Sequence, residues 1–230
     1  MVLDIKRHRI VMMDIWKDIV ASPYGKVLGF KGGTLLYFLY NLDRFSTDMD
    51  FDLLWKVDEE KILSDLAVIC WNYGKIKDIY NKENTLFLLV DYKSHDMNIK
   101  IEINKRTWKH DSFSFRNVLW YQALCMDPDC LFANKLVALT QRNRIASRDI
   151  YDIHFFFKNG FTINESLIKE RTWKSLSDYL QELLIFIPKN FGKDTLLAWL
   201  WELISEKQKT FVKEKLIHEV MNYIQITLRE

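Results

Sequence analysis

Apolar and polar residues in the first half of the chain follow two different periods. Between residues 4 and 20, Met12, Ile15, Trp16 and Ile19 recur at the three- and four-residue spacing of an amphipathic helix. Around residue 51, apolar residues alternate one by one with aspartates, which is the period of a strand. Such patterns predict helices at 4–20, 34–40 and 58–73 and strands at 26–30, 49–55, 75–81, 85–92 and 97–104. Segment 107–118 follows neither period.

Beyond Pro128 the pattern is helical throughout. The predicted helices lie at about 129–142, 148–158, 164–170, 173–187, 193–206 and 208–228. We therefore expect an α+β protein, with a mixed sheet and flanking helices in residues 1–118 and a helical bundle in residues 119–230. A chain of 230 residues is long enough for two such domains.

Composition narrows the class of protein only modestly. The net charge of +2 is too small to indicate a nucleic-acid partner by itself. The three cysteines form no C-x-x-C pair, which is typical of reduced cysteines in a cytosolic protein. The amphipathic N-terminus has no signal-peptide core, and no apolar run approaches the ~20 residues of a membrane span. We expect a cytoplasmic protein without a membrane partner.

Three aspartates, Asp48, Asp50 and Asp52, share one face of the predicted strand at 49–55, because strand side chains alternate between faces. Neighbouring positions on that face are about 7 Å apart, since a strand rises ~3.3 Å per residue, and like charges this close repel. A divalent cation would remove the conflict, because Mg²⁺ commonly takes one or two carboxylates together with substrate phosphates. A solvated acidic strand face is the alternative.

A pair of glycines precedes the aspartates. Gly32-Gly33-Thr34 lies between a predicted strand and a predicted helix, where backbone N–H groups and the helix dipole favour a phosphate. The motif is neither a Walker A loop nor G-x-G-x-x-G. Arg44 and Ser46 follow and could reach phosphate oxygens. The alternative is a tight turn with Thr34 as the helix cap.

Another carboxylate, Glu102, lies on the polar face of the predicted strand at 97–104. If that strand lies beside 49–55, Glu102 could join Asp48 and Asp50 around two metals, an arrangement that supports phosphoryl transfer. An exposed glutamate on an amphipathic strand is the alternative.

These motifs resemble a known family. Gly-Gly-Thr at 32–34 followed by Arg-x-Ser-x-Asp-x-Asp-Phe at 44–51 resembles the opening motif of AbiEii/AbiGii-type nucleotidyltransferase toxins, within the DNA polymerase β-like nucleotidyltransferase superfamily. The segment DPDCLFANKLVALTQRNRIASRDIYDIHFF at 127–156 is similar to the second block of that family, a lysine-bearing helix followed by an Arg-Asp-x-x-Asp helix. The resemblance covers residues 30 to 156 in order and spacing.

The resemblance implies a nucleotidyltransferase catalytic domain in 1–118 and a helical domain in 119–230 that completes the active site. It implies metal ligation, by Mg²⁺ or Mn²⁺, at Asp48, Asp50 and Glu102. The implied triphosphate-binding residues are Gly32, Gly33, Ser46 and Lys135.

The helical half would contribute Asp149 and Asp152 beside Lys135. From the residues alone, Lys135 is either a phosphate ligand or a lysine that extends past apolar neighbours to solvent. Asp149 is either a site residue or a carboxylate placed favourably in the first turn of its helix. Glu102 and Asp149 are the two candidates for a general base.

The implied activity is metal-dependent transfer of a nucleoside monophosphate from an NTP to an acceptor hydroxyl, by a toxin that is paired with an antitoxin. The implied acceptor is an RNA 3′ end, in particular that of tRNA. Basic runs at 105–110 and 142–148, with Trp108 for stacking, agree with an RNA acceptor but are also typical of solvated loops. The alternatives are a nucleotidylating enzyme acting on a protein hydroxyl and a non-catalytic module that binds nucleotide or a partner protein.

Overall fold

The computed structural model describes residues 4–92, 97–142, 146–192, 196–197 and 200–229. The chain divides into two compact units. The sheet unit comprises Met1–Thr107 and Phe113–Met126, and the helical unit comprises Trp108–Ser112 and Asp127–Glu230. No helix of the described segments combines the length and apolarity that a membrane crossing requires.

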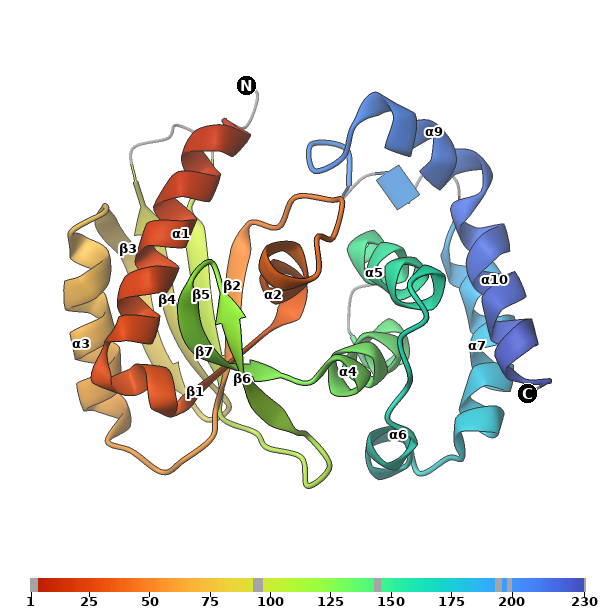
Figure 1. Ribbon diagram of the computed structural model, residues 1–230, viewed down its shortest axis with the longest axis horizontal. Helices are drawn as coiled ribbons and strands as arrows, with labels where there is room; N and C mark the ends of the chain where they lie inside the picture. Colours follow the sequence, from red (N-terminus) through yellow and green to blue (C-terminus); the bar gives the residue numbers. More distant parts are fainter. Residues whose placement is uncertain (1–3, 93–96, 143–145, 193–195, 198–199, 230) are drawn as a thin grey trace. The chain divides into compact units, whose positions relative to one another are not determined.

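The sheet unit is built on a seven-stranded mixed sheet (Figure 1). Across the sheet the strands run in the order β3 (Lys75–Lys82), β4 (Thr85–Asp91), β5 (Ile99–Asn104), β2 (Asp48–Leu53), β1 (Leu28–Lys31), β7 (Tyr121–Met126) and β6 (Phe113–Val118). The pairs β2–β5 and β1–β7 are parallel, and the other pairs are antiparallel. The α+β prediction is therefore confirmed.

Helices cover the apolar side of this sheet. Figure 1 shows α1 (Ile5–Ala21) and α3 (Glu59–Trp71) side by side along it. The ring of Trp16, which is fully buried, lies 5.5 Å from that of Phe30, and Phe30 lies 5.2 Å from Phe51. The one-by-one alternation that predicted β2 thus places Phe51 in the core and leaves the intervening aspartates on the opposite face.

The second hairpin of the sheet was not predicted. Segment 107–118 had no assignment, yet 113–118 forms β6, and β7 follows at 121–126. The predicted boundary at residue 118 therefore falls inside the β6–β7 hairpin. The turn at Leu119 and Trp120 has positive φ at both residues, which is the backbone of a type I′ turn without its usual Asn-Gly sequence, so the turn signal was missing.

The helical unit contains α4 (Pro128–Gln141), α5 (Ser147–Lys158), α6 (Glu165–Thr172), α7 (Leu176–Asn190), α9 (Glu206–Glu214) and α10 (Leu216–Thr227). The single helix predicted at 208–228 is wrong, because Lys215, at φ −126°, separates α9 from α10. The start predicted at 173 is also displaced: Trp173 ends α6 in a left-handed conformation, and Ser175 caps α7. Of the helix predicted at 193–206, residues 193–195 and 198–199 lie outside the described residues.

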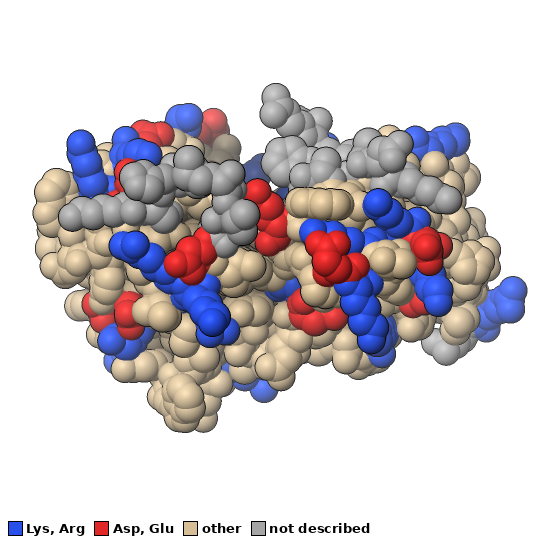
Figure 2. Space-filling view, turned by 90° about the horizontal axis from the view of Figure 1, so that it is seen from above, with Lys and Arg blue, Asp and Glu red and all other residues tan. Residues whose placement is uncertain are grey.

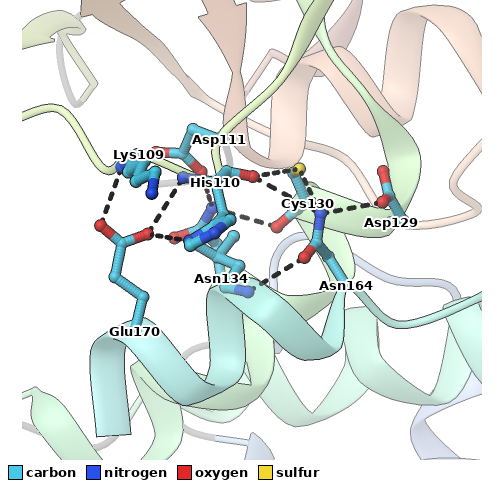
Figure 3. Close-up of polar contacts among 9 residues, drawn as sticks. Lys109, His110, Asp111, Asp129, Cys130, Asn134, Asn164 and Glu170 are labelled. Atoms are coloured by element: carbon cyan, nitrogen blue, oxygen red, sulfur yellow. Dashed lines mark hydrogen bonds and ion pairs between the residues drawn. The ribbon is translucent and has the colours of Figure 1, made fainter. Parts of the chain in front are cut away.

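The short segment Trp108–Ser112 belongs to the helical unit although it lies between β5 and β6 in sequence. Glu170 on α6 accepts hydrogen bonds from the backbone N–H of Lys109 at 2.8 Å and of His110 at 3.0 Å (Figure 3). Asn134 on α4 donates to Asp111 Oδ1 at 3.0 Å. Asn164 caps α6 and also contacts Cys130, so this cluster ties the segment to two helices.

Candidate active site

The strand register brings the predicted carboxylates onto one face of the sheet. In the parallel pair β2–β5, Asp50 lies opposite Glu102 and Asp48 lies opposite Lys100. Asp48, Asp50 and Glu102 are half-buried, whereas the intervening Met49 is fully buried. The three residues thus lie on neighbouring strands, as predicted. We refer to them below as the carboxylate row.

Two lysines lie on the same face. Lys100 Nζ lies 3.5 Å from Asp48 Oδ2 and 3.3 Å from Glu102 Oε2, so it is ion-paired with two members of the carboxylate row. Lys31 Nζ instead lies 2.5 Å from Asp52 Oδ1, which also accepts a 2.8 Å hydrogen bond from Asn104. Asp52 is only 2% exposed. This separates Asp52, whose bonds support the strands, from the half-buried carboxylate row.

The glycine pair begins α2 (Gly32–Leu39) directly beside the carboxylate row. Gly32 has φ +78°, and a Cβ there would lie 2.3 Å from Asp50 Oδ2. Gly32 is therefore required both for the left-handed backbone and for the close approach of Asp50. The N-cap residue is Lys31, whose ammonium is a donor and cannot cap, so the first N–H groups of α2 are suited to an anionic ligand.

Arg44 and Ser46 meet over the second glycine. A Cβ on Gly33 would lie 2.7 Å from Arg44 Nη2 and 2.9 Å from Ser46 Oγ. Arg44 is 2% exposed and donates from Nη1 to the Phe45 carbonyl at 3.0 Å. The structure therefore brings a guanidinium and a hydroxyl to the N-terminus of α2, where both could bind phosphate oxygens.

The Thr34 side chain does not cap α2, which was one of the alternatives that the sequence left open. Its fully buried hydroxyl lies 3.0 Å from Ser46 Oγ and contacts the backbone oxygen of Asp48 closely. Thr34 thus ties α2 to the start of β2 and fixes where Asp48 lies.

The three predicted residues of the helical unit also lie together. Lys135 Nζ lies 2.9 Å from Asp149 Oδ1 and 2.7 Å from Asp152 Oδ2. Arg142 Nη1 lies 2.9 Å from the other Asp149 oxygen. Asp149 and Asp152 are 1% and 0% exposed, so both carboxylates are removed from water and lie against these cations. This set of four side chains is referred to below as the lysine cluster.

The lysine cluster changes the interpretation of Asp149. Its side chain pairs with two cations instead of capping α5, and it is only 1% exposed, whereas the Glu102 side chain is 40% exposed. Of the two candidate general bases, Glu102 is therefore the more accessible.

The carboxylate row fits a hard divalent cation in donor chemistry, since Asp48 and Asp50 supply carboxylate oxygens beside a phosphate-binding helix start. Among the described residues, no three His, Cys, Asp or Glu side chains converge as a finished metal site. The Lys100 ammonium lies between two of the carboxylates, Asp48 and Glu102, and pairs with both. These carboxylates are therefore directed toward the ammonium and not toward a common metal position. The residues fit a metal that is completed by substrate oxygens.

Sequence reasoning missed one contact to the segment that delivers Asp48. His8 on α1 is fully buried, with Nε2 3.1 Å from the Thr47 carbonyl oxygen and Nδ1 2.7 Å from the Tyr92 hydroxyl. Burial lowers the pKa of His8 more than the Thr47 hydrogen bond and the Asp48 charge raise it. A neutral ring can donate to Thr47 and accept from Tyr92. No sequence motif marks His8, because its partners are distant in the chain.

One protein family matches the sequence of the chain, and two solved structures have a similar fold. Residues 14–195 match the family described as "Nucleotidyl transferase AbiEii toxin, Type IV TA system". The fold is similar to the crystal structures of a "putative nucleotidyltransferase from H. pylori" (TM-score 0.64) and of JHP933 from Helicobacter pylori (TM-score 0.62). Both are 21% identical to the chain and align over all of it, covering 96% and 94% of their own lengths. No curated protein matches the sequence.

Proposed function

Because the chain belongs to the AbiEii family of nucleotidyl transferase toxins, we propose that it transfers a nucleoside monophosphate from an NTP to an acceptor hydroxyl, with Mg²⁺ as the metal and release of pyrophosphate. The observation that carries this proposal is the placement of Asp48, Asp50 and Glu102 directly beside Gly32 at the start of α2. Carboxylates for a metal and N–H groups for phosphates are the two requirements of this reaction.

In the proposed reaction the acceptor oxygen attacks the α-phosphorus of the NTP. The bond from that phosphorus to the bridging oxygen of the β-phosphate breaks, and pyrophosphate leaves with the electron pair. Glu102 accepts the proton of the acceptor hydroxyl. When bound to Asp48 and Asp50, the metal supplies positive charge that stabilises the transition state.

The chain's own residues hold the triphosphate in this proposal. Gly32 and Gly33 offer backbone N–H groups, and Arg44 and Ser46 bind phosphate oxygens beside them. In the helical unit, Lys135 is the phosphate ligand that the family resemblance implies. Asp149 and Asp152 orient Lys135, since both carboxylates lie within 3 Å of its ammonium nitrogen.

The proposed acceptor is the 3′ end of an RNA, in particular a tRNA. Support comes from the toxin family and from the basic run at 105–110, although two of its members already have partners. Lys105 pairs with Glu59 at 2.9 Å, and Arg171 stacks 5.0 Å from the Trp108 ring. Residues 143–145 of the second basic run lie outside the described residues. Figure 2 shows acidic and basic side chains interspersed on the face that it presents, so RNA affinity would depend on local contacts.

We further propose that a cognate antitoxin restrains the protein, as the type IV toxin–antitoxin family indicates. A cytoplasmic location follows from the proposed substrates, since NTPs and tRNA are found there.

A labelling assay tests the proposal. The purified chain is incubated with each of the four α-labelled NTPs, total RNA and Mg²⁺, and the products are separated into RNA and protein. We expect label on RNA with a preference for one or two NTPs, and no label with EDTA. Label on protein alone would replace the RNA acceptor with a protein hydroxyl. An Asp48→Asn variant that labels as fast as the wild type would overturn the metal-centred mechanism.

A further inference from the structure

The side chain of Lys100 lies among the residues that are proposed to bind the metal. Its ammonium is 3.5 Å from Asp48 and 3.3 Å from Glu102, and it arrives there because β5 pairs with β2 in parallel register. Lys100 and Glu102 share a strand face as residues i and i+2, and Asp48 lies opposite Lys100 on the neighbouring strand. The register of β5 with β2, and not only the side-chain rotamer of Lys100, therefore brings the ammonium to these carboxylates.

The other ion pair on the same face shows what a purely structural pair looks like. Asp52 is 2% exposed and is bound by both Lys31 and Asn104. Lys100 and its two carboxylates are more open, with side-chain exposures of 28% for Lys100, 20% for Asp48 and 40% for Glu102. Partly solvated ion pairs are weaker, so Lys100 can leave its partners at modest cost. Lys31 is similarly exposed, at 26%, but its departure would leave the buried Asp52 carboxylate without its ammonium partner.

We propose that Lys100 is an internal counter-cation that makes metal binding depend on the triphosphate. This inference rests on the proposed function and adds a residue and an order of binding to it. Without ligands, the ammonium offsets the repulsion within the carboxylate row. A divalent cation that arrives alone must displace this ammonium and leave it beside a second positive charge.

A triphosphate removes that obstacle. Its oxygens carry negative charge and accept hydrogen bonds, so the displaced ammonium gains a new partner when metal and nucleotide arrive together. The two ligands then bind cooperatively, and by linkage each raises the affinity of the protein for the other by the same factor. The free protein would bind little metal, and the carboxylate row would hold a metal ion only when the substrate is present.

Metal binding without turnover tests this inference. Mn²⁺ is titrated into the full-length chain by calorimetry, and thermal stability is measured in EDTA, in Mn²⁺, and in Mn²⁺ with inorganic tripolyphosphate. The variants are Lys100→Met, which keeps an apolar stem, and Lys100→Arg, which keeps the charge. Lys77→Met is the matched control, because it removes the same charge from an ion pair with Asp91 at 3.2 Å on β3 and β4.

Lys100→Met is expected to bind Mn²⁺ about fivefold or more tightly than the wild type. Mn²⁺ alone should stabilise this variant, whereas the wild type and Lys100→Arg should require tripolyphosphate as well. Lys77→Met should bind Mn²⁺ like the wild type. Unchanged or weaker Mn²⁺ binding by a folded Lys100→Met overturns the inference.

Asp48→Asn separates this outcome from failure of the proposed function. If Asp48→Asn loses the stabilisation that the wild type gains from Mn²⁺ with tripolyphosphate, while Lys100→Met binds Mn²⁺ alone no better than the wild type, the metal site stands and only the role of Lys100 is wrong. If Asp48→Asn gains as much stability as the wild type from Mn²⁺ with tripolyphosphate, the metal site itself is wrong, and with it both proposals.

Discussion

The carboxylate row of the sheet unit and the lysine cluster of the helical unit differ in how deeply their ion pairs are buried. In the lysine cluster, Lys135 and Arg142 face Asp149 and Asp152, so two cations meet two carboxylates that are almost fully buried. In the carboxylate row, Lys100 faces Asp48 and Glu102, with Asp50 next to them, and the side chains are partly exposed.

The difference separates partly exposed carboxylates, which an added cation can reach, from buried carboxylates that are already ion-paired. A buried, balanced cluster is costly to break, because removing one member leaves an uncompensated charge. A partly exposed row can exchange its ammonium partner for an added cation at lower cost. We therefore expect substitutions in the carboxylate row to affect catalysis and those in the lysine cluster to affect stability as well.

The largest effect is expected for Asp48→Asn, which keeps the shape of the side chain and removes one ligand charge. Nucleotidyl transfer should fall on the order of 10³-fold, as for loss of a principal electrostatic contact in a transition state. The free energy of unfolding should hardly change, because like-charge repulsion is relieved as the Lys100 contact weakens. Labelling rates measure the transfer activity, and urea unfolding measures the free energy of unfolding. A large loss of stability with normal activity would contradict the expectation that the carboxylate row serves catalysis.

Lys135→Met should destabilise the protein by about 3 kcal/mol, because Asp149 and Asp152 lose a shared partner while buried. The matched control is the triple variant Lys135→Met/Asp149→Asn/Asp152→Asn. In this variant no buried carboxylate has lost its lysine partner, because both carboxylates are replaced by amides. Urea denaturation should show part of the stability restored in the triple variant, with activity still low. Equal stability of the single and triple variants would contradict the charge-balance argument.

Gly32→Ala should lower both stability and activity. The added Cβ would lie 2.3 Å from Asp50 Oδ2 at a φ of +78°, so the backbone is strained and the carboxylate must move. We expect a loss of about 1–2 kcal/mol from the left-handed backbone and roughly 10²-fold slower transfer from the displaced ligand.

Gly160→Ala is the control for Gly32→Ala. Gly160 has φ +67° but nothing within 4 Å of an added Cβ, so the strain occurs without displacement of a neighbour. It should cost about 1 kcal/mol with no change in transfer rate. If both alanine variants keep full activity, the close approach of Asp50 to Gly32 has no catalytic importance.

The smallest effect concerns Glu170, a carboxylate held mainly by N–H donors. Burial raises its pKa, but hydrogen bonds from Lys109 and His110 outweigh burial, and the net pKa is lowered. A lowered folded-state pKa contributes stability above the unfolded value of about 4.3, and this contribution is lost as the pH falls through the folded pKa. Glu170→Gln should cost about 1 kcal/mol at pH 7 and flatten this acid dependence, as measured by urea unfolding between pH 7 and pH 3. An unchanged pH profile would contradict the assignment.

Local periodicity predicted most of the elements because each element is amphipathic on its own. The alternation at 48–53 and 99–104 placed Asp48, Asp50 and Glu102 on one face, and the register of β2 with β5 made them neighbours. The β6–β7 hairpin escaped prediction since its turn uses Leu119 and Trp120 at positive φ, where no turn motif is visible. The end of α9 at Lys215 was not predicted either, because the helical spacing of apolar residues continues across it.

Contacts between distant segments were beyond the sequence. Lys100 shares the polar face of its strand with Glu102, but its pairing with Asp48 depends on which strands are neighbours. The His8 contact to Thr47 joins residues 39 positions apart and leaves no local pattern. The grouping of Lys135 with Asp149 and Asp152 came from the family resemblance, and their ion pairs became visible only in the folded helices.

The path of the chain between the two units has a consequence for biosynthesis. Residues 108–112 fold with the helices, and residues 113–126 return to complete the sheet beside β1. During synthesis, β1 therefore remains an open sheet edge until residue 126 has left the ribosome, and open edges invite aggregation. A fragment that stops at residue 118 would keep this edge exposed. Expression of the sheet unit alone should thus extend at least to Met126.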